Sequence, residues 1–292
     1  MNLLRILCVG VCLIWIQIQA APLKIACVGD SITAGTELAN PTLESYPPRL
    51  QRLLGTNSIV RNYGVSGRTL LKKGDFPYWN EAFFKQSHDW FPDIVIIQLG
   101  TNDSKPQNWR YGTNFVSDYE ELIASYASLS STPKVFVCTP CPVYGTGAYD
   151  IKPGIVATNI APEVRDIAER LNLDLIDLHT RYAGHSEWFP DTVHPNSKGT
   201  VAMTAMMFDA LAGGAPTEEP PPALIQRLSA TKVELSWPAR WGGLVPQSTT
   251  ALKNTNTVWT LVDAAIPSGD GNWIRQTNSS AGAPKLFRLW QP

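Results

Sequence analysis

The feature that most constrains this chain is a regular alternation of short apolar runs and amphipathic helical patterns. Gly or another turn-forming residue follows most of the apolar runs. Because parallel strands have to be joined by crossovers, such alternation predicts an α/β fold, with a parallel sheet covered by helices on both faces. The predicted strands lie at residues 23–28, 58–62, 93–99, 134–138 and 173–178, and the predicted helices at 46–54, 115–129, 161–171 and 197–211.

Residues 1–20 have the pattern of a secretory signal peptide. Arg5 precedes an apolar run from Ile6 to Ile16, and small residues follow at Ala20 and Ala21. The run is too short for a transmembrane helix, which needs about 20 apolar residues. We therefore expect cleavage near Ala20 and a secreted protein, periplasmic or extracellular, without a membrane span. The alternative is a buried N-terminal strand or helix.

The chemistry of the chain changes after residue 213. Residues 214–222 form a Pro-rich linker, and residues 223–292 contain neither His nor Cys. Alternating patterns in the latter predict strands at 232–237, 257–262 and 285–290. We expect a domain over residues 22–213 and a small all-β module over 223–292. Three roles stay open for the module: binding glycan, tethering the protein to a surface or partner, and covering a face of the first domain. Its tryptophans either fill the core of the module or form exposed sugar platforms; they are Trp237, Trp241, Trp259, Trp273 and Trp290.

Charge and cysteine content exclude several function classes. The chain has 24 Lys and Arg against 25 Asp and Glu, which leaves no global field for nucleic acid. Removal of the signal peptide would leave Cys27, Cys138 and Cys141, an odd number that argues against a disulfide scaffold. We expect Cys138 and Cys141 to be buried or locally bridged, with redox chemistry as the alternative. The sequence shows no metal-ligand cluster and no phosphate loop, so neither a metal nor a cofactor is expected.

Reactive groups follow three of the predicted strands. Ser31 stands in Gly29-Asp30-Ser31 after the first strand, where a tight turn into a helix exposes its hydroxyl. Gly64 follows the second strand and Asn102 the third. Because the carboxyl ends of parallel strands meet at one edge of a sheet, we expect these groups to lie together. The N–H groups of Ser31 and Gly64 and the amide of Asn102 are predicted to form an oxyanion hole.

A base for the serine stands near the end of the predicted domain. A serine hydroxyl is a weak nucleophile without an adjacent base. Asp191 and His194 lie three residues apart before the last helix, a spacing that lets the carboxylate bind the imidazole and fix its tautomer. We predict Ser31 as nucleophile, His194 as base and Asp191 as its orienting acid. Each motif alone is as well explained by an ordinary turn or surface pair, but their joint placement favours catalysis. Asp30, next to the predicted nucleophile, is expected to bind backbone amides of its own turn.

These motifs resemble the four blocks of the SGNH, or GDSL-type, hydrolases, in the order and spacing of that family over residues 24–212. The resemblance implies a flavodoxin-like three-layer α/β/α sandwich and ester hydrolysis by a Ser-His-Asp triad. It implies the same roles for Ser31, Gly64, Asn102, Asp191 and His194. Ile32 stands where the name-giving leucine of the family stands, which changes packing only.

Two loops carry a closer resemblance. Residues 62–75 and 100–109 are similar to loops of exported sialate O-acetylesterases and other carbohydrate acetylesterases, which implies removal of O-acetyl groups from sugars. Aromatic faces in predicted loops suit stacking on a pyranose, and charged side chains suit hydroxyl groups. The alternative is that the aromatic residues pack the loops onto the sheet. The candidate substrate-binding residues are Arg68, Trp79, Trp109 and Trp188.

Two other functions stay open on this sequence. The same site suits a short-chain acyl esterase, a lysophospholipase or an acyltransferase. From another class, the chain could be a carbohydrate-binding or adhesion protein with a degenerate hydrolase domain, which the intact motif set argues against. Our leading prediction is a secreted serine esterase that acts on acetylated carbohydrate.

Overall fold

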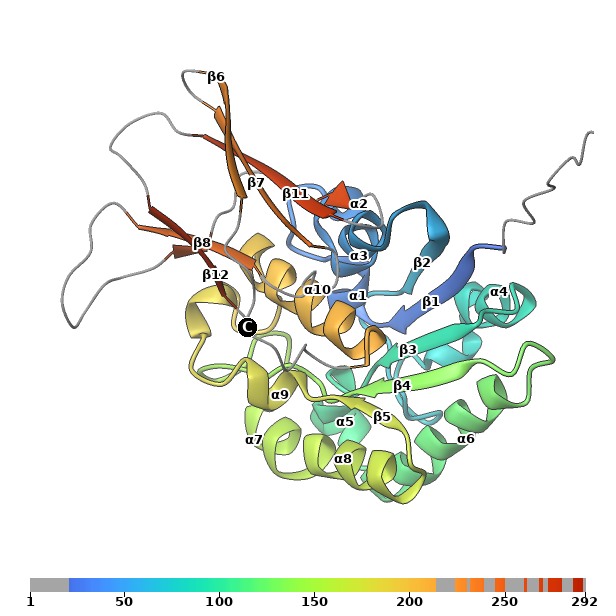
Figure 1. Cartoon of the computed structure of the whole chain (residues 1–292). Helices are drawn as coiled ribbons and strands as arrows, with labels where there is room; N and C mark the ends of the chain where they lie inside the picture. Colours follow the sequence, from blue (N-terminus) through green and yellow to red (C-terminus); the bar gives the residue numbers. More distant parts are fainter. Residues whose placement is uncertain are drawn as a thin grey trace, which may run out of the picture.

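The computed structural model describes residues 21–213 and, beyond them, strand segments between residues 224 and 290 (Figure 1). The predicted signal peptide at residues 1–20 and the linker at 214–222 lie outside the described residues. Within the part that is described, no helix has the length and apolar character needed to cross a membrane.

A single parallel sheet forms the centre of residues 21–213. Its strand order is β2-β1-β3-β4-β5, and every neighbouring pair is parallel. This confirms the predicted α/β fold with flavodoxin-like topology. β2 lies on one side of β1, and β3 and the later strands lie on the other. The crevice above β1 and β3 is therefore the switch point at which such sheets bind ligands. The strands are β1 Leu23–Gly29, β2 Ser58–Gly64, β3 Ile94–Gln98, β4 Lys134–Cys138 and β5 Asp174–Ile176.

Helices cover both faces of this sheet (Figure 1). The four predicted helices are present, and two of them, α3 and α10, have the predicted bounds. Pro47 and Pro48 fall in the first turn of α3, where a missing N–H costs nothing. The α-helices are α1 Ser31–Ala34, α2 Pro41–Glu44, α3 Tyr46–Leu54, α4 Ala82–Asp89, α5 Pro106–Trp109, α6 Phe115–Ala127, α7 Pro153–Ile155, α8 Ala161–Arg170, α9 Leu178–Arg181 and α10 Ser197–Leu211. Short 3₁₀ turns occupy Gly55–Asn57, Tyr78–Asn80, Asn102–Ser104, Gly112–Asn114 and Ser186–Trp188, and a π turn occupies Val156–Ile160.

Alternate residues of each strand enter two separate cores. Ile25 and Cys27 of β1 pack with α3 and α10, whereas Ala26 and Val28 pack with α6 and α8. This two-sided burial explains why the strands are apolar at nearly every position. Cys27, Cys138 and Cys141 are buried as free thiols, so the local-bridge alternative is not observed. Burial raises the pKa of Cys27 to about 12, which keeps that thiol protonated and unreactive.

Beyond residue 213 the structure describes strands in two antiparallel sheets, one of order β10-β11-β7-β6 and one of order β12-β8-β9. Leu235 of β7 is buried and belongs to the core on the α3 and α10 side. Of the predicted strand at 257–262, only Thr260–Leu261 is described. The side chains of the five tail tryptophans lie outside the described residues, and a separate binding module stays a prediction. These strands are β6 Leu224–Ser229, β7 Lys232–Pro238, β8 Val245–Thr249, β9 Thr260–Leu261, β10 Ser268–Gly269, β11 Trp273–Ser279 and β12 Leu286–Trp290.

Candidate active site

Ser31 lies directly above the carboxyl end of β1, at the first residue of α1. The Asp30 carboxylate caps this helix by accepting a 2.9 Å hydrogen bond from the Ile32 N–H, as predicted for a structural role. Gly29 is required here because a Cβ would lie 2.1 Å from Thr33 Oγ1. The N–H of Ser31 has no intrahelical acceptor, since it opens the helix, and it is available to a ligand.

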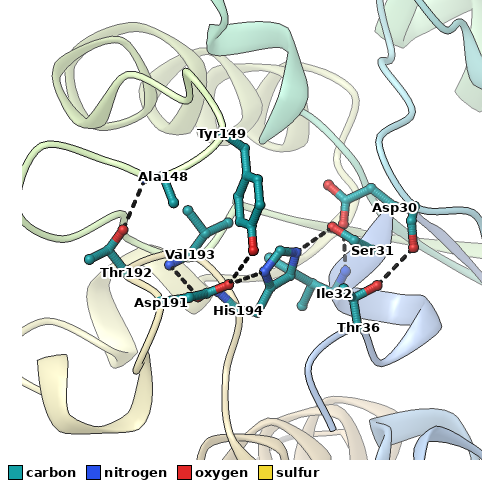
Figure 2. A network of polar contacts seen from close by, with 11 residues as sticks. Asp30, Ser31, Ile32, Thr36, Ala148, Tyr149, Asp191, Thr192, Val193 and His194 are labelled. Carbon is teal, nitrogen blue, oxygen red and sulfur yellow. Dashed lines mark hydrogen bonds and ion pairs between the residues drawn. The ribbon is translucent and has the colours of Figure 1, made fainter.

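The structure brings Ser31, His194 and Asp191 together in one hydrogen-bonded chain (Figure 2). His194 Nε2 lies 2.8 Å from Ser31 Oγ, and His194 Nδ1 lies 2.6 Å from Asp191 Oδ2. Ser31 and His194 are 7% and 5% exposed, so water competes little for this chain. The two residues are 163 positions apart, and only the fold places them in contact.

Asp191 is held by its own turn as well as by the imidazole. Its Oδ1 accepts hydrogen bonds from the N–H groups of Val193 and His194, at 3.0 and 2.7 Å. Burial pushes the pKa of Asp191 upward, but the hydrogen bonds from His194 and Val193 outweigh it and leave the pKa below its usual value. The carboxylate therefore stays ionised and keeps the Nδ1 hydrogen of His194 directed toward itself.

Asn102 follows β3 and is 3% exposed. Its side-chain amide donates one hydrogen bond to the Arg68 carbonyl, at 3.1 Å. That bond fixes the orientation of the amide and leaves its second N–H for a ligand in the pocket that Asn102 lines together with Ser31.

The structure does not support Gly64 as an oxyanion donor. The Gly64 N–H donates to Asn62 Oδ1 at 2.8 Å, and Gly64 does not line the pocket that contains Ser31. Gly67, three residues later, does line it. Gly67 has a φ of +82°, a conformation that favours glycine, and the described residues contain no acceptor for its N–H. Gly64 is the last residue of β2 and Gly67 lies three residues beyond it, so the sequence pattern alone did not separate the glycine that ends the strand from the one beside the pocket.

The pocket around Ser31 and His194 has a volume of about 230 Å³. Its walls come from five segments: α1 with the residues that follow it, the loop after β2, the turn after β3, the turn that carries His194, and the loop between β4 and α7. The last of these was not predicted to contribute. Its signal in the sequence was the pair Gly145 and Gly147, which lies between Tyr144 and Tyr149. The lining residues are Ser31, Thr36, Glu37, Ser66, Gly67, Asn102, Lys105, Tyr149, Ile151 and His194.

None of the four predicted substrate-binding residues lines this pocket. Trp188 is 6% exposed and packs in the core against Tyr182, so its prediction as a sugar platform is wrong. Trp79 donates its indole N–H to the Leu70 carbonyl at 2.8 Å. Trp79 and Trp109 are half-buried against the core on the α6 side. This agrees with the alternative that the aromatic residues pack the loops onto the sheet.

Arg68 is engaged by its own loop. Its Nε lies 2.7 Å from Glu81 Oε1, and Nη1 donates to the Ser66 carbonyl at 2.7 Å. The side chain thus anchors the loop after β2, while the backbone carbonyl of Arg68 orients Asn102. Its effect on the pocket is therefore indirect, which corrects its prediction as a substrate contact.

A profile of the GDSL-like lipase/acylhydrolase family matches residues 27–202, more than half of the chain. The chain belongs to this family. The match confirms the family resemblance that the four motifs predict. Within the second motif, Gly67 lines the pocket, whereas the resemblance points to Gly64.

This GDSL-like chain also resembles individual proteins. An acetylxylan esterase from Xylanibacter ruminicola is 36% identical over 219 residues, which cover 68% of this chain and 45% of that relative. A carbohydrate acetylesterase structure from Sinorhizobium meliloti has a TM-score of 0.52 at 19% identity, over 65% of this chain and 99% of the other. A lipase/acylhydrolase structure from Enterococcus faecalis has a TM-score of 0.50 at 27% identity, over 63% and 93%. The two solved structures share the fold of residues 21–213.

The remaining histidines lie away from the pocket. His88 is half-buried between α4 and α6, where its ring stacks on Tyr126 with centroids 4.0 Å apart. No group of three or more His, Cys, Asp or Glu within the described part of this GDSL-like chain is arranged to hold a metal ion. The prediction that no cofactor is needed stays a prediction.

Asp103 ties the loop after β2 to the turn after β3. Its carboxylate accepts hydrogen bonds from the N–H groups of Leu70 and Leu71, at 3.0 and 2.7 Å. Asp103 is fully buried, and that burial raises its pKa to about 7 against the opposing effect of the two backbone hydrogen bonds. Burial likewise raises the pKa of nearby Asp30 to about 6. The segment that carries Gly67 is thus held by a carboxyl group that titrates near neutrality.

Asp103 should therefore make stability depend on pH. Its folded pKa lies above the unfolded value of 3.8, so the native state retains a proton that the unfolded chain releases. This contribution is present below about pH 4 and is lost as pH rises toward 7. Urea unfolding at several pH values measures the free energy of unfolding. Between about pH 4 and pH 7 this free energy should fall less in Asp103→Asn than in wild type, by a few kcal/mol, on the order expected for such a shift.

Asp89→Asn is the matched control for this measurement, because Asp89 is exposed and pairs with Lys85 across one helical turn. It should leave the wild-type slope unchanged. Equal slopes for Asp103→Asn and wild type would show that Asp103 is ionised throughout this pH range.

Proposed function

We propose that this protein is a carbohydrate O-acetylesterase in which Ser31, His194 and Asp191 act as nucleophile, base and orienting acid. The observation that carries the proposal is the continuous hydrogen-bonded chain from Ser31 Oγ through the imidazole to Asp191. Membership in the GDSL-like lipase/acylhydrolase family and the likeness to an acetylxylan esterase support ester hydrolysis and an acetylated sugar substrate.

In the proposed first step, Ser31 Oγ attacks the acetyl carbonyl while His194 Nε2 accepts its proton. The 2.8 Å separation of these two atoms allows direct transfer. Asp191 stabilises the resulting imidazolium, to which it is already bound through Nδ1. The imidazolium then protonates the departing sugar oxygen, and an acetyl-serine remains.

Three donors would meet the negative charge that develops on the carbonyl oxygen. The N–H of Ser31 at the start of α1, the N–H of Gly67 and the amide of Asn102 all belong to the pocket wall. Gly67 replaces Gly64 in this role because the Gly64 N–H is bound to Asn62. In the second step His194 removes a proton from water, which attacks the acetyl-serine. The imidazolium then returns that proton to Ser31 Oγ as the C–O bond breaks, and acetate is released.

The size of the pocket favours a short acyl group. Its volume is about 230 Å³, and Ile151, which is 2% exposed, supplies its apolar wall. An acetyl methyl group can contact this wall, whereas the long chain of a lysophospholipid would need an apolar groove that these lining residues do not provide. Acetyl esters are therefore preferred over lipid esters in this proposal.

Loss of the serine hydroxyl should abolish the reaction. For Ser31→Ala we expect acetate release from acetylated xylo-oligosaccharides to fall at least about a thousand-fold, as in other serine hydrolases. Enzymatic determination of acetate measures the rate. Ser128→Ala, an exposed serine on the far end of α6, is the control and should match wild type. Turnover of lysophospholipid but not acetylated sugar would favour the lipase alternative, and no turnover of any ester would favour a binding protein.

Removal of the Asn102 amide should slow the chemical step. One oxyanion donor contributes about 3 kcal/mol, so Asn102→Ala should lower kcat roughly 100- to 1,000-fold with a smaller change in KM. Steady-state kinetics on the same substrate test this, with the thermal unfolding midpoint as a check on folding. Asn80→Ala, which alters an exposed asparagine, should leave kcat unchanged. An unchanged kcat in Asn102→Ala would remove Asn102 from the oxyanion hole.

We also propose that the chain is exported and that residues 1–20 are removed. The support is the sequence pattern of Arg5, the apolar run to Ile16 and the small residue Ala20. Expression of the full chain in a Gram-negative host should yield periplasmic protein whose N-terminal sequence begins at Ala21. A Leu13→Arg variant, with a charge in the apolar run, should stay in the cytoplasm. Cytoplasmic wild-type protein that begins at Met1 would contradict export.

A further inference from the structure

Tyr149 stands at the mouth of the pocket, beside the proposed base (Figure 2). Its ring meets the imidazole of His194 edge-on, with centroids 5.6 Å apart and planes at 65°. Its hydroxyl donates a long hydrogen bond of 3.4 Å to Asp191 Oδ2. Tyr149 is 55% exposed, although its ring contacts the buried His194.

The loop that carries Tyr149 is fixed to the turn that carries Asp191 and His194. The N–H groups of Tyr144 and Ala148 donate to the carbonyl and the hydroxyl of Thr192, at 2.9 and 3.0 Å. Beneath the loop, Ile151 packs in a small apolar cluster with Val156 and Val193. The position of the Tyr149 ring is therefore determined by the same turn that holds the proposed base.

Backbone conformation around this ring is unfavourable. Tyr149, Asp150 and Thr192 have φ values of +56°, +62° and +76°, in the left-handed region that side chains other than glycine rarely occupy. Such conformations persist where surrounding contacts impose them, and they cluster at binding sites. Tyr149 belongs to none of the apolar clusters of the described residues, so packing does not explain why the chain holds an aromatic ring here.

We propose that Tyr149 is a specificity-determining residue: its exposed ring forms the subsite for the pyranose from which the acetyl group is removed. The assignment rests on the proposed esterase function. Ile151 and Asn102, both almost fully buried, occupy the acyl end of the pocket, whereas Tyr149 and Glu37 occupy its open end. The alcohol part of the ester must leave through that open end.

The open end has the chemistry that a sugar ring needs. A pyranose presents C–H groups on its faces, which pack on an aromatic ring, and hydroxyl groups at its edge, which need polar partners. Thr36 and Ser66, whose hydroxyl groups lie 2.7 Å apart, line the pocket with the exposed carboxylate of Glu37. A sugar seated on Tyr149 would find these acceptors along the pocket wall. Trp79, Trp109 and Trp188 cannot serve, because they do not line the pocket.

Two esters with the same acyl group separate this role from catalysis. One is a mono-O-acetylated methyl xyloside, which carries a pyranose, and the other is ethyl acetate, which carries no ring. We expect Tyr149→Ala to raise KM for the xyloside about tenfold, the usual size of an aromatic contact, with kcat within about twofold. Its kcat/KM for ethyl acetate should stay within about twofold of wild type. Tyr149→Phe, which keeps the ring, should retain the wild-type KM for the xyloside.

Phe91→Ala is the matched control. Phe91 is also an exposed aromatic residue with a positive φ, of +49°, but it lies between α4 and β3, away from the pocket. It should change neither ester's kinetics. Equal loss on both esters in Tyr149→Ala would overturn the proposal, because it would mean that the ring only positions His194. Equal loss in Tyr149→Phe and Tyr149→Ala would also overturn it, because the hydroxyl would then be the active group.

A binding measurement keeps this test separate from the proposed function. In the Ser31→Ala background, calorimetry with an acetylated xylo-oligosaccharide should show about tenfold weaker binding when Tyr149→Ala is added. If wild type hydrolysed no ester but Tyr149→Ala still weakened sugar binding, the esterase proposal would fail and the subsite would stand. Unchanged binding together with active wild-type enzyme would remove the subsite alone.

Discussion

The rest of the site depends on one constraint: the carboxyl ends of β1, β2 and β3 are in register at one edge of the sheet. Gly29 pairs with Gly64 on one side and with Gln98 on the other, so the three chains leave the sheet at the same height. The segments that follow them therefore converge above β1, where α1 presents Ser31 and the neighbouring loops present Gly67 and Asn102. Strand pairing thus determines which side chains meet before any contact between those side chains forms.

Buried polar groups then hold the converging loops in place. Asp103 binds the backbone of Leu70 and Leu71, and Asp118 accepts a 2.9 Å hydrogen bond from the Lys72 N–H. These carboxylates satisfy backbone donors that would otherwise be buried without a partner, which is costly. The loop after β2 is consequently positioned by Asp103 in the turn after β3 and by Asp118 in α6, in addition to hydrophobic packing.

Most of the fold and the core of the site could be predicted from the sequence because their signals are local or periodic. The strands covered on both faces are continuous apolar runs, and Asp191 and His194 are close enough in sequence to share a turn. Gly64 and Gly67 could not be separated in this way, since their difference is the direction of one N–H in the folded chain. Trp188 and Tyr149 show the same limit for aromatic residues. Whether a loop tryptophan faces the core or a loop tyrosine faces solvent depends on packing between distant segments.

Thr192 joins the loop that carries Tyr149 to the turn that carries Asp191 and His194. Its carbonyl and hydroxyl hold the Tyr144 to Ile151 loop, while its neighbours on either side are Asp191 and Val193, in the turn that carries the proposed acid and base. A change in the length of that loop would pull on Thr192 and so shift the carboxylate away from the imidazole. In the proposed enzyme, Thr192 therefore links the residues for substrate binding to the residues for turnover. Loops grafted here from relatives would have to bring a partner for Thr192 with them.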